Sequence, residues 1–323
     1  MRKHISSTSS PTFIILGAGA MGSLFGALLS EKYSAMLISR KEHVKKIKEN
    51  GLLLSGSVEK TYTISAATSI KKIATNTIIL LAMKVHDSKT ALESIKTKVK
   101  KDTIIVILQN GLGQEQDLQK LVSCPVIRVV TERGATFRAP GHIRCIEDFP
   151  TYIEKGGEGI AHYFNSVGIT TKVVDDIRRY EWEKLMINCV INSCGSILRV
   201  PNNQLNQKSL EPIKKAIVDE CVLVAIADGY TFNYDILAKV NRFIKKSVNI
   251  NSTLQDLQKG KQTEIEYLNG AIVRLGKKYG IKTPVNETLY YLVKSIETLS
   301  SLTTPGVEEE RSDGKTPGVN KLK

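Results

Sequence analysis

The stretch TFIILGAGAMGSLFGALLS, residues 12–30, decides how the first half of the chain folds. It opens with a short apolar run typical of a strand, and its apolar residues from Met21 to Leu29 then recur at helical spacing. Between these two patterns, Gly17, Gly19 and Gly22 complete the motif GxGxxG. A strand, a glycine turn and a helix in this order predict a turn that binds a dinucleotide.

Each glycine of this motif has its own expected role. Gly17 permits the tight turn, Gly19 lets a pyrophosphate approach the backbone, and Gly22 allows the helix to pack closely on the strand. The N-terminus of the helix faces the phosphates, because its free backbone N–H groups and the helix dipole attract anions.

A second strand, AMLIS at residues 35–39, ends beside Arg40 and Lys41. A protein that binds NAD usually carries Asp or Glu here, which hydrogen-bonds the ribose hydroxyls. An arginine instead suits a 2′-phosphate, through bidentate, charge-assisted hydrogen bonds. Arg40 therefore favours NADP over NAD, and the alternative is a surface arginine that binds no ligand.

Three more apolar runs predict strands: TIILLAMK from Thr77, TIIVILQNG from Thr103 and VIRVV from Val126. They alternate with charged segments that can be helical, which indicates a parallel sheet covered on both faces. Ligands of such sheets lie beyond the carboxyl ends of the strands. Lys84 and Asn110 follow two of these strands, so both are expected beside the cofactor. A solvated loop cation and a simple turn are the alternatives.

The second half of the chain is predicted to be helical. After Asp175 apolar residues recur at helical spacing, and one long helical segment stops at Gly229. The expected fold class is an α/β Rossmann-type parallel sheet domain followed by an all-α C-terminal domain. The expected parts are a flexible N-terminal extension at 1–10, an NADP-binding domain at 11–175, a helical substrate and catalytic domain at 176–302, and a disordered tail at 303–323.

Composition narrows the classes of function. The 323 residues are 41% hydrophobic, enough for two ordinary cores, and no apolar run reaches the roughly 20 residues of a membrane span. The net charge of +14 comes from lysines spread along the chain, without a nucleic-acid motif. We expect a cytoplasmic protein that binds neither nucleic acid nor membrane, with organelle import through the basic N-terminal extension as the alternative. The oligomeric state is not readable, and a homodimer stays open.

Five cysteines, odd in number and without a CxxC pair, argue against a disulfide framework and a zinc site. We expect them to be buried apolar side chains. The five histidines are scattered and show no paired spacing, so no ligand set for a metal is visible and none is expected.

The stretch KLMINCVIN, residues 184–192, carries a polar stripe. As a helix it places Lys184, Asn188 and Asn192 at i, i+4 and i+8 on one face, while apolar residues cover the rest. Solvated faces usually carry Glu, Lys and Arg, and asparagine is a poor helix former. A buried amide without a partner costs about 1–3 kcal/mol, so a half-buried stripe needs a group that satisfies it. The alternative is the wet side of an amphipathic helix.

Together these residues resemble one family, the ketopantoate reductases, also named 2-dehydropantoate 2-reductases. The resemblance runs from about Phe13 to Ser300, and the order and spacing of its motifs are specific. The motifs are GAGAMG from Gly17, the strand-end Lys84, QNGLG from Gln109, GATFRAPG from Gly134, EWEKLMINCVIN from Glu181, PNNQL from Pro201, NINSTLQD from Asn249 and TEIEYLNG from Thr263.

The resemblance implies NADPH-dependent reduction of 2-dehydropantoate to (R)-pantoate, on the route to pantothenate and coenzyme A. It implies that Lys184 donates the proton to the C2 carbonyl oxygen and that Glu264, a second catalytic residue, lies near both ligands. The implied substrate-binding residues are Asn110, Lys184, Asn188, Asn192, Asn202, Asn249 and Ser252. The implied cofactor-binding residues are Gly17, Ala18, Gly19, Ala20, Met21, Gly22, Arg40, Lys84, Asn110, Ala135 and Glu264.

Two other functions stay open. The sheet and the stripe do not define the acyl branch of the substrate, so a related NADP-dependent reductase of another 2-oxo acid is one alternative. A non-catalytic NADPH-binding regulator is the other, although a regulator has no need of a proton donor at Lys184. The pKa of Lys184 is also open, because burial would lower it while Glu264 or a substrate carboxylate would raise it.

Overall fold

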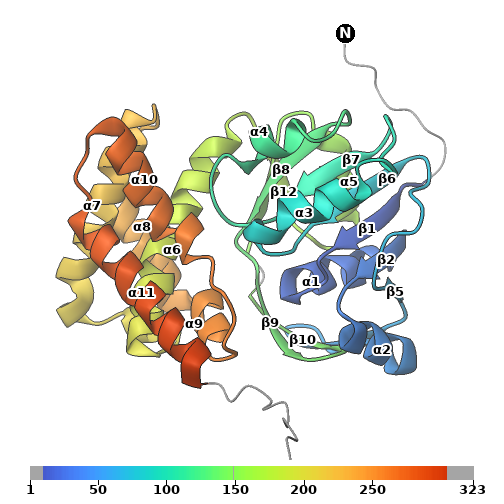
Figure 1. Ribbon diagram of the computed structural model, residues 1–323, viewed down its shortest axis with the longest axis horizontal. Coiled ribbons are helices and arrows are strands. Elements are labelled where there is room, and N and C mark those ends of the chain that lie inside the picture. Colours follow the sequence, from blue (N-terminus) through green and yellow to red (C-terminus); the bar gives the residue numbers. More distant parts are fainter. Residues whose placement is uncertain (1–9, 148, 304–323) are drawn as a thin grey trace, which may run out of the picture.

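The computed structural model describes residues 10–147 and 149–303. Within them, a mostly parallel sheet with alternating helices is followed by a helical part, as the sequence predicted. Figure 1 shows the two parts next to each other, with the helix α6 (Ile177–Leu198) between the sheet and the other helices. Of the predicted N-terminal extension and C-terminal tail, only Ser10 and Thr303 lie within the described residues.

The main sheet has eight strands in the order β12-β11-β8-β7-β6-β1-β2-β5. Neighbouring strands are parallel, as expected, except for β8 and β11, which run antiparallel. The sheet is therefore mostly parallel, whereas the prediction was a parallel sheet. The chain between β8 and β11 contains a hairpin and no helix, whereas a parallel return needs a crossover connection. The strands are β1 Thr12–Leu16, β2 Ser34–Ile38, β5 Ser65–Ala67, β6 Thr77–Leu81, β7 Ile104–Ile107, β8 Val126–Thr131, β11 Thr151–Glu154 and β12 Thr171–Val174.

Side chains of β1 point alternately to the two faces of this sheet. Phe13 and Ile15 belong to one buried apolar cluster, and Ile14 and Leu16 belong to another. Both faces are covered, which explains why the strand is apolar at successive positions. The helices of this part are α1 Ala20–Leu29, α2 Lys41–Asn50, α3 Val85–Ile95, α4 Gln114–Gln119 and α5 Glu158–Ser166.

A second sheet of four strands, in the order β4-β3-β10-β9, was not predicted. The charged residues between the second and third predicted strands were interpreted as helical, yet only α2 is a helix there, and β3, β4 and β5 follow it. These strands are short, and Lys60 and Thr61 on β4 are exposed, so their pattern resembles that of a polar loop. The strands are β3 Leu52–Gly56, β4 Lys60–Tyr62, β9 Gly134–Ala139 and β10 His142–Glu147.

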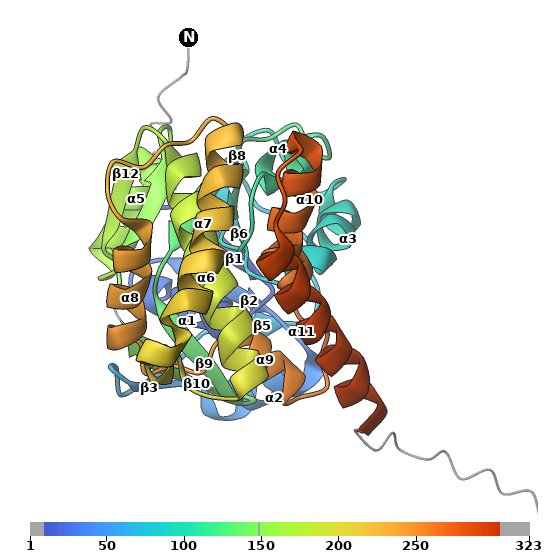
Figure 2. The same ribbon diagram turned by 90° about the vertical axis from the view of Figure 1, so that its left-hand side faces the viewer.

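The helical part packs around the fully buried Trp182 of α6. Figure 2, which faces this part, shows α6 and α7 flanked by α8 on one side and by α10 and α11 on the other. Its other helices are α7 Glu211–Ala227, α8 Ile236–Lys246, α9 Ser252–Leu257, α10 Asn269–Tyr279 and α11 Pro284–Thr303. Its short 3₁₀ turns are η1 Asn202–Leu205, η2 Lys208–Leu210 and η3 Ile265–Tyr267.

The second half was predicted to be helical, but the connection between α9 and α10 is not. The chain leaves α9 at Leu257 and resumes a long helix only at Asn269. Gly260 adopts a left-handed conformation with φ +58°, which ends the first helix. The interruption places the loop with Glu264 beside the sheet instead of inside a helix.

All five cysteines are free and buried, as the sequence predicted. Among the described residues, no helix has the length and apolar character to cross a membrane. Within the same ranges, no three His, Cys, Asp or Glu side chains gather where they could hold a metal ion.

Candidate active site

A cavity of about 1020 Å³ lies between the carboxyl ends of the central strands and the helices α6 and α9. This is large for a small-molecule site, as a dinucleotide and a substrate together require. Every residue predicted for the site lines it except Gly22. These residues are Gly17, Ala18, Gly19, Ala20, Met21, Arg40, Lys84, Asn110, Ala135, Lys184, Asn188, Asn192, Asn202, Asn249, Ser252 and Glu264.

The glycine turn leaves room at one position and none at the other two. A Cβ on Gly17, whose φ is +94°, would clash with the backbone of Met83 on the neighbouring strand end. A Cβ on Gly22 would lie 2.6 Å from the carbonyl oxygen of Gly17, so the helix packs tightly there. By contrast, nothing lies within 4 Å of a Cβ built on Gly19. Helix α1 has no side-chain cap at this N-terminus, and its first N–H groups can therefore bind a phosphate.

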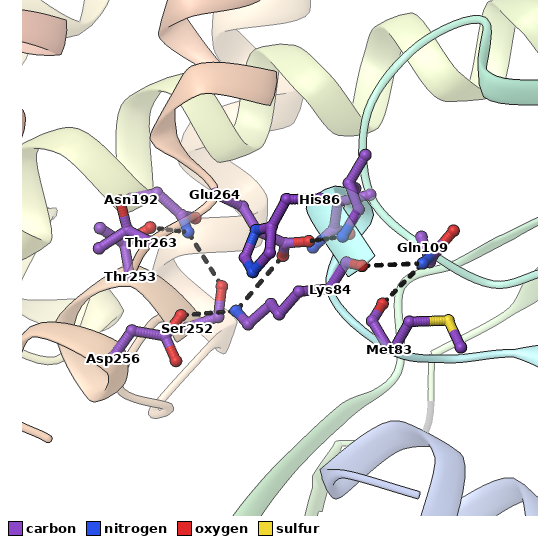
Figure 3. Close-up of polar contacts among 12 residues, drawn as sticks. Met83, Lys84, His86, Gln109, Asn192, Ser252, Thr253, Asp256, Thr263 and Glu264 are labelled. Carbon is purple, nitrogen blue, oxygen red and sulfur yellow. Dashed lines mark hydrogen bonds and ion pairs between the residues drawn. The ribbon is translucent and has the colours of Figure 1, made fainter. Parts of the chain in front are cut away.

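Lys84 joins the two parts of the molecule through a pair of carboxylates (Figure 3). Its Nζ lies 2.5 Å from Asp256 Oδ2 and 3.4 Å from Glu264 Oε2. The other carboxylate oxygen of Glu264 accepts a hydrogen bond from the backbone N–H of Val85, at 3.0 Å, where α3 begins. Burial disfavours the ammonium of Lys84, but Glu264 and Asp256 outweigh it and raise its pKa. Lys84 is therefore a permanent cation on one wall of the cavity.

Asp256 was quoted only as the last residue of the motif NINSTLQD and was given no role, although it follows the predicted Ser252 by one helical turn on α9. Gln109 was quoted only as part of a motif, and it holds the turn that carries Lys84. Its side-chain Nε2 donates to the carbonyl oxygens of Met83 at 2.8 Å and Lys84 at 3.3 Å, as Figure 3 shows. The main chain before α3 is thereby tied to the end of β7.

The polar stripe of α6 is real, but its three members differ. Lys184 and Asn188 are half-buried and line the cavity, whereas Asn192 is only 2% exposed. The side-chain nitrogen of Asn192 donates to Ser252 Oγ at 3.1 Å and to Thr253 Oγ1 at 2.9 Å, where α9 begins (Figure 3). The expectation that substrate oxygens satisfy the whole stripe is therefore wrong for this nitrogen, which ties α6 to α9.

Asn202 in η1 and Asn249 before α9 add two polar side chains to the lining of the cavity. Asn202 is buried, and its side-chain nitrogen donates to Ser247 Oγ at 3.0 Å, while its Oδ1 is buried without a partner among the described residues. Asn249 accepts a hydrogen bond from Thr136 Oγ1 at 3.2 Å through its own Oδ1. A donor on a ligand could satisfy the free Oδ1 of Asn202.

The ammonium of Lys184 forms no hydrogen bond or ion pair within residues 10–147 and 149–303. Burial and the nearby guanidinium of Arg128 lower its pKa to about 8, although Glu132 and Glu264 oppose this shift. Burial thus wins the competition that the sequence left open. A lysine with this pKa is largely protonated at neutral pH and gives up its proton more readily than an exposed one.

Arg128 and Glu181 form a buried ion pair next to Lys184. Arg128 Nε lies 2.5 Å from Glu181 Oε1, and the two side chains are 2% and 1% exposed. Arg128 also donates through Nη2 to the carbonyl oxygen of Gly111 at 2.9 Å. No periodic pattern in the sequence indicates this pair, because Arg128 interrupts an otherwise apolar strand and its partner lies in the next half of the chain.

Two adjoining family descriptions match most of the chain. Ketopantoate reductase PanE/ApbA matches residues 13–158, and its C-terminal counterpart matches residues 176–297. The chain belongs to the ketopantoate reductase family. Ketopantoate reductases are oxidoreductases, and this chain is therefore an enzyme of that class.

Similar proteins span nearly the same length. A 2-dehydropantoate 2-reductase of Pyrococcus horikoshii is 34% identical over 295 residues, which cover 88% of this chain and 97% of the relative. The corresponding protein of Archaeoglobus fulgidus is 32% identical over 295 residues, with the same coverage.

Solved structures show the same fold. A PanE/ApbA family ketopantoate reductase from Ralstonia eutropha is 30% identical, with a TM-score of 0.83 over 90% of this chain and 99% of that one. A D-mandelate dehydrogenase with NADH and anilino(oxo)acetate is 28% identical, with a TM-score of 0.80 and the same coverage. Ketopantoate reductases therefore share their fold with an enzyme whose structure contains NADH, and the fold alone does not select NADP.

Proposed function

We propose that this chain reduces 2-dehydropantoate to (R)-pantoate with NADPH. One observation carries the proposal: Lys184, whose ammonium has no hydrogen bond or ion pair with the described residues and whose pKa is about 8, lines the same cavity as the glycine turn at Gly17. The names of the relatives support ketopantoate as the substrate. Arg40 at the end of β2 supports NADP as the cofactor, as no acid stands there to bind a free ribose 2′-hydroxyl.

The cavity fits a dinucleotide. The open space at Gly19 and the free N–H groups of α1 would hold the pyrophosphate. Arg40 would bind the 2′-phosphate, and Lys84 with Glu264 would bind ribose hydroxyls. Bound NADPH supplies the hydride that reduces a carbonyl carbon. Lys84 keeps its charge throughout, because its two carboxylate partners raise its pKa.

Lys184 has the chemistry of the proton donor. As negative charge develops on the C2 carbonyl oxygen of the substrate, Nζ of Lys184 donates its proton, so that an N–H bond breaks and an O–H bond forms. The lysine is left neutral, a state that burial favours. It regains a proton from water through its exposed side in the cavity.

Neutral amides suit the rest of the substrate. Asn188 beside Lys184 makes no hydrogen bond with other described residues, so both ends of its amide are available to the ketone and the carboxylate. The buried, unpartnered Oδ1 of Asn202 can accept a hydrogen bond from the substrate hydroxyl. Asn249 and Ser252 complete this wall, and Asn192 positions Ser252 through its side-chain nitrogen.

The test follows the absorbance of NADPH after purified protein is mixed with 2-dehydropantoate. We expect rapid oxidation, with a higher kcat/KM than for 2-oxoisovalerate, which lacks the hydroxyl group, and for pyruvate. Oxidation with the other acids alone would replace this proposal by a reductase of another 2-oxo acid. Binding of NADPH without consumption on any of them would indicate a regulator.

The likeness to the D-mandelate dehydrogenase supports a second candidate, an NADH-dependent dehydrogenase of an aromatic 2-hydroxy acid. Its test is the reverse reaction, with D-mandelate and NAD in place of pantoate and NADP. We expect little turnover, because Arg40 favours the phosphorylated cofactor. Faster turnover with D-mandelate and NAD would favour the second candidate.

A further inference from the structure

We propose that Lys261, on the helical part, completes the 2′-phosphate site opposite Arg40, so that both parts of the chain together select NADP over NAD. The inference rests on the proposed function, because it explains how that site distinguishes the two cofactors. It assigns a cofactor role to Lys261, a residue that no sequence motif indicated.

The turn after α9 presents Lys261 to the cavity in a defined position. The backbone N–H groups of Lys259 and Lys261 both donate to the carbonyl oxygen of Asp256, at 3.0 Å and 2.9 Å. Gly260 between them adopts φ +58°, a conformation that other residues rarely adopt. Lys261 and Arg40 line the same cavity, Lys261 from the helical part and Arg40 from the sheet part of the chain.

The two cations are free to bind an anion. Lys259 next to them is already engaged, because its Nζ lies 3.4 Å from the carbonyl oxygen of Phe137 and 5.8 Å from the centre of that ring. Within the described part of the chain, neither Lys261 nor Arg40 makes a side-chain hydrogen bond or ion pair. Glu42, which also lines the cavity, pairs with neither of them.

Like charges that line the same cavity disfavour each other. Burial lowers the pKa of Lys261, and the positive charges of Arg40 and then Lys259 lower it further. Asp256 attracts Lys261, but its carboxylate is bonded to Lys84 at 2.5 Å. Burial lowers the pKa of the neighbouring His43 to about 4, so this histidine is neutral and adds no charge. An unbalanced positive pair in a cavity is what a phosphate dianion would offset.

The experiment measures binding of two nucleotides by calorimetry on the full chain, without turnover. The probes are 2′,5′-ADP, which carries the 2′-phosphate, and 5′-AMP, which lacks it. Wild-type protein should bind 2′,5′-ADP more tightly. Lys261→Gln should lower the affinity for 2′,5′-ADP by about tenfold, the scale of one lost charge-assisted hydrogen bond, and should leave the affinity for 5′-AMP unchanged. Lys261→Arg should retain the preference.

Lys282→Gln is the matched control, because Lys282 is exposed, does not line the cavity and loses the same charge. It should leave both affinities unchanged. An unaltered ratio of the two affinities in Lys261→Gln, or an equal loss of affinity for both probes, would overturn the inference about Lys261. It would leave the proposal that Arg40 selects NADP untouched. A wild-type protein without preference for 2′,5′-ADP would overturn the choice of NADP itself, and the inference with it.

Discussion

Lys84 and Lys184 line one cavity, yet their surroundings give them opposite acid–base behaviour. Lys84 lies between Asp256 and Glu264, whose carboxylates raise its pKa in spite of burial. Lys184 has no such partner among the described residues, and burial beside Arg128 lowers its pKa to about 8. The comparison teaches that the side-chain type does not decide the acid–base behaviour of a lysine. Its surroundings raise the pKa of Lys84 and lower that of Lys184, as the proposed proton donor requires.

The largest expected effect comes from removing the ammonium group of Lys184. Lys184→Ala should lower kcat by at least about 100-fold, the usual contribution of a general acid, while NADPH still binds. Steady-state rates and fluorescence titration with NADPH measure the two quantities. Near-normal turnover in this variant would contradict the role of Lys184.

A charge-retaining variant sharpens this result. Lys184→Arg keeps a cation in the cavity, but a guanidinium does not release its proton at neutral pH. If proton donation is the role of Lys184, this variant should be nearly as slow as Lys184→Ala. Substantial recovery of kcat would instead show that positive charge alone is sufficient.

The second effect tests the Lys84 end. Lys84→Met leaves the carboxylates of Asp256 and Glu264 close together without their cation, so the variant should lose about 2 kcal/mol of stability to unfolding. Urea denaturation at neutral pH measures this loss. The deficit should shrink in acid, since protonation of the two carboxylates removes their repulsion. A stability equal to that of wild type would show that the contacts of Lys84 with Asp256 and Glu264 do not stabilise the folded protein.

The third effect concerns pH. Lys184 must be protonated to donate, so kcat/KM for carbonyl reduction should fall above pH about 8, where the free enzyme loses that proton. Replacing the pair by Arg128→Met with Glu181→Leu removes a cation that lowers the pKa of Lys184 more than Glu181 raises it. The alkaline fall should then move upward, by up to about one unit. Arg128→Lys keeps the charge and should leave the profile in place, and an unshifted double variant would contradict the role of Arg128.

The smallest effect provides the baseline for ion pairs in this chain. Lys60 and Glu31 pair at 2.8 Å, with side chains 54% and 34% exposed. Lys60→Gln should change stability by less than about 0.5 kcal/mol, because water screens the pair. The same urea denaturation measures this change in stability. A loss as large as that of Lys84→Met would show that the exposed pair stabilises the protein as much as the contacts of Lys84 with Asp256 and Glu264.

Much of the fold was predictable from local patterns. The strand from Thr12 to Leu16 has the predicted bounds, and the glycine turn follows it as expected. The second sheet was not predicted, because β3 and β4 are short, partly exposed strands whose alternation competes with a polar loop pattern. The pairing of β10 with β3 joins residues far apart in the sequence, and no local pattern indicates such a pairing.

The candidate site was predictable in membership more than in detail. The stripe from Lys184 to Asn192 could be read from helical spacing, and its residues line the cavity. Asp256, Arg128 and Lys261 carried no such signal. Each contacts or influences a charged group on the other part of the chain. Periodicity within one segment does not indicate which residues of distant segments lie close together.

The sequence by itself determined the strand, the glycine turn and the polar helix face, because these depend on residues within a few positions of one another. Only the tertiary structure decided that the pKa of Lys84 is raised and that of Lys184 lowered. A pKa depends on the water and the charges that surround a group in space, and Asp256 reaches Lys84 across 172 positions of the chain. The same is true of Arg40 and Lys261, which line one cavity from the two parts of the chain although 221 positions separate them in the sequence.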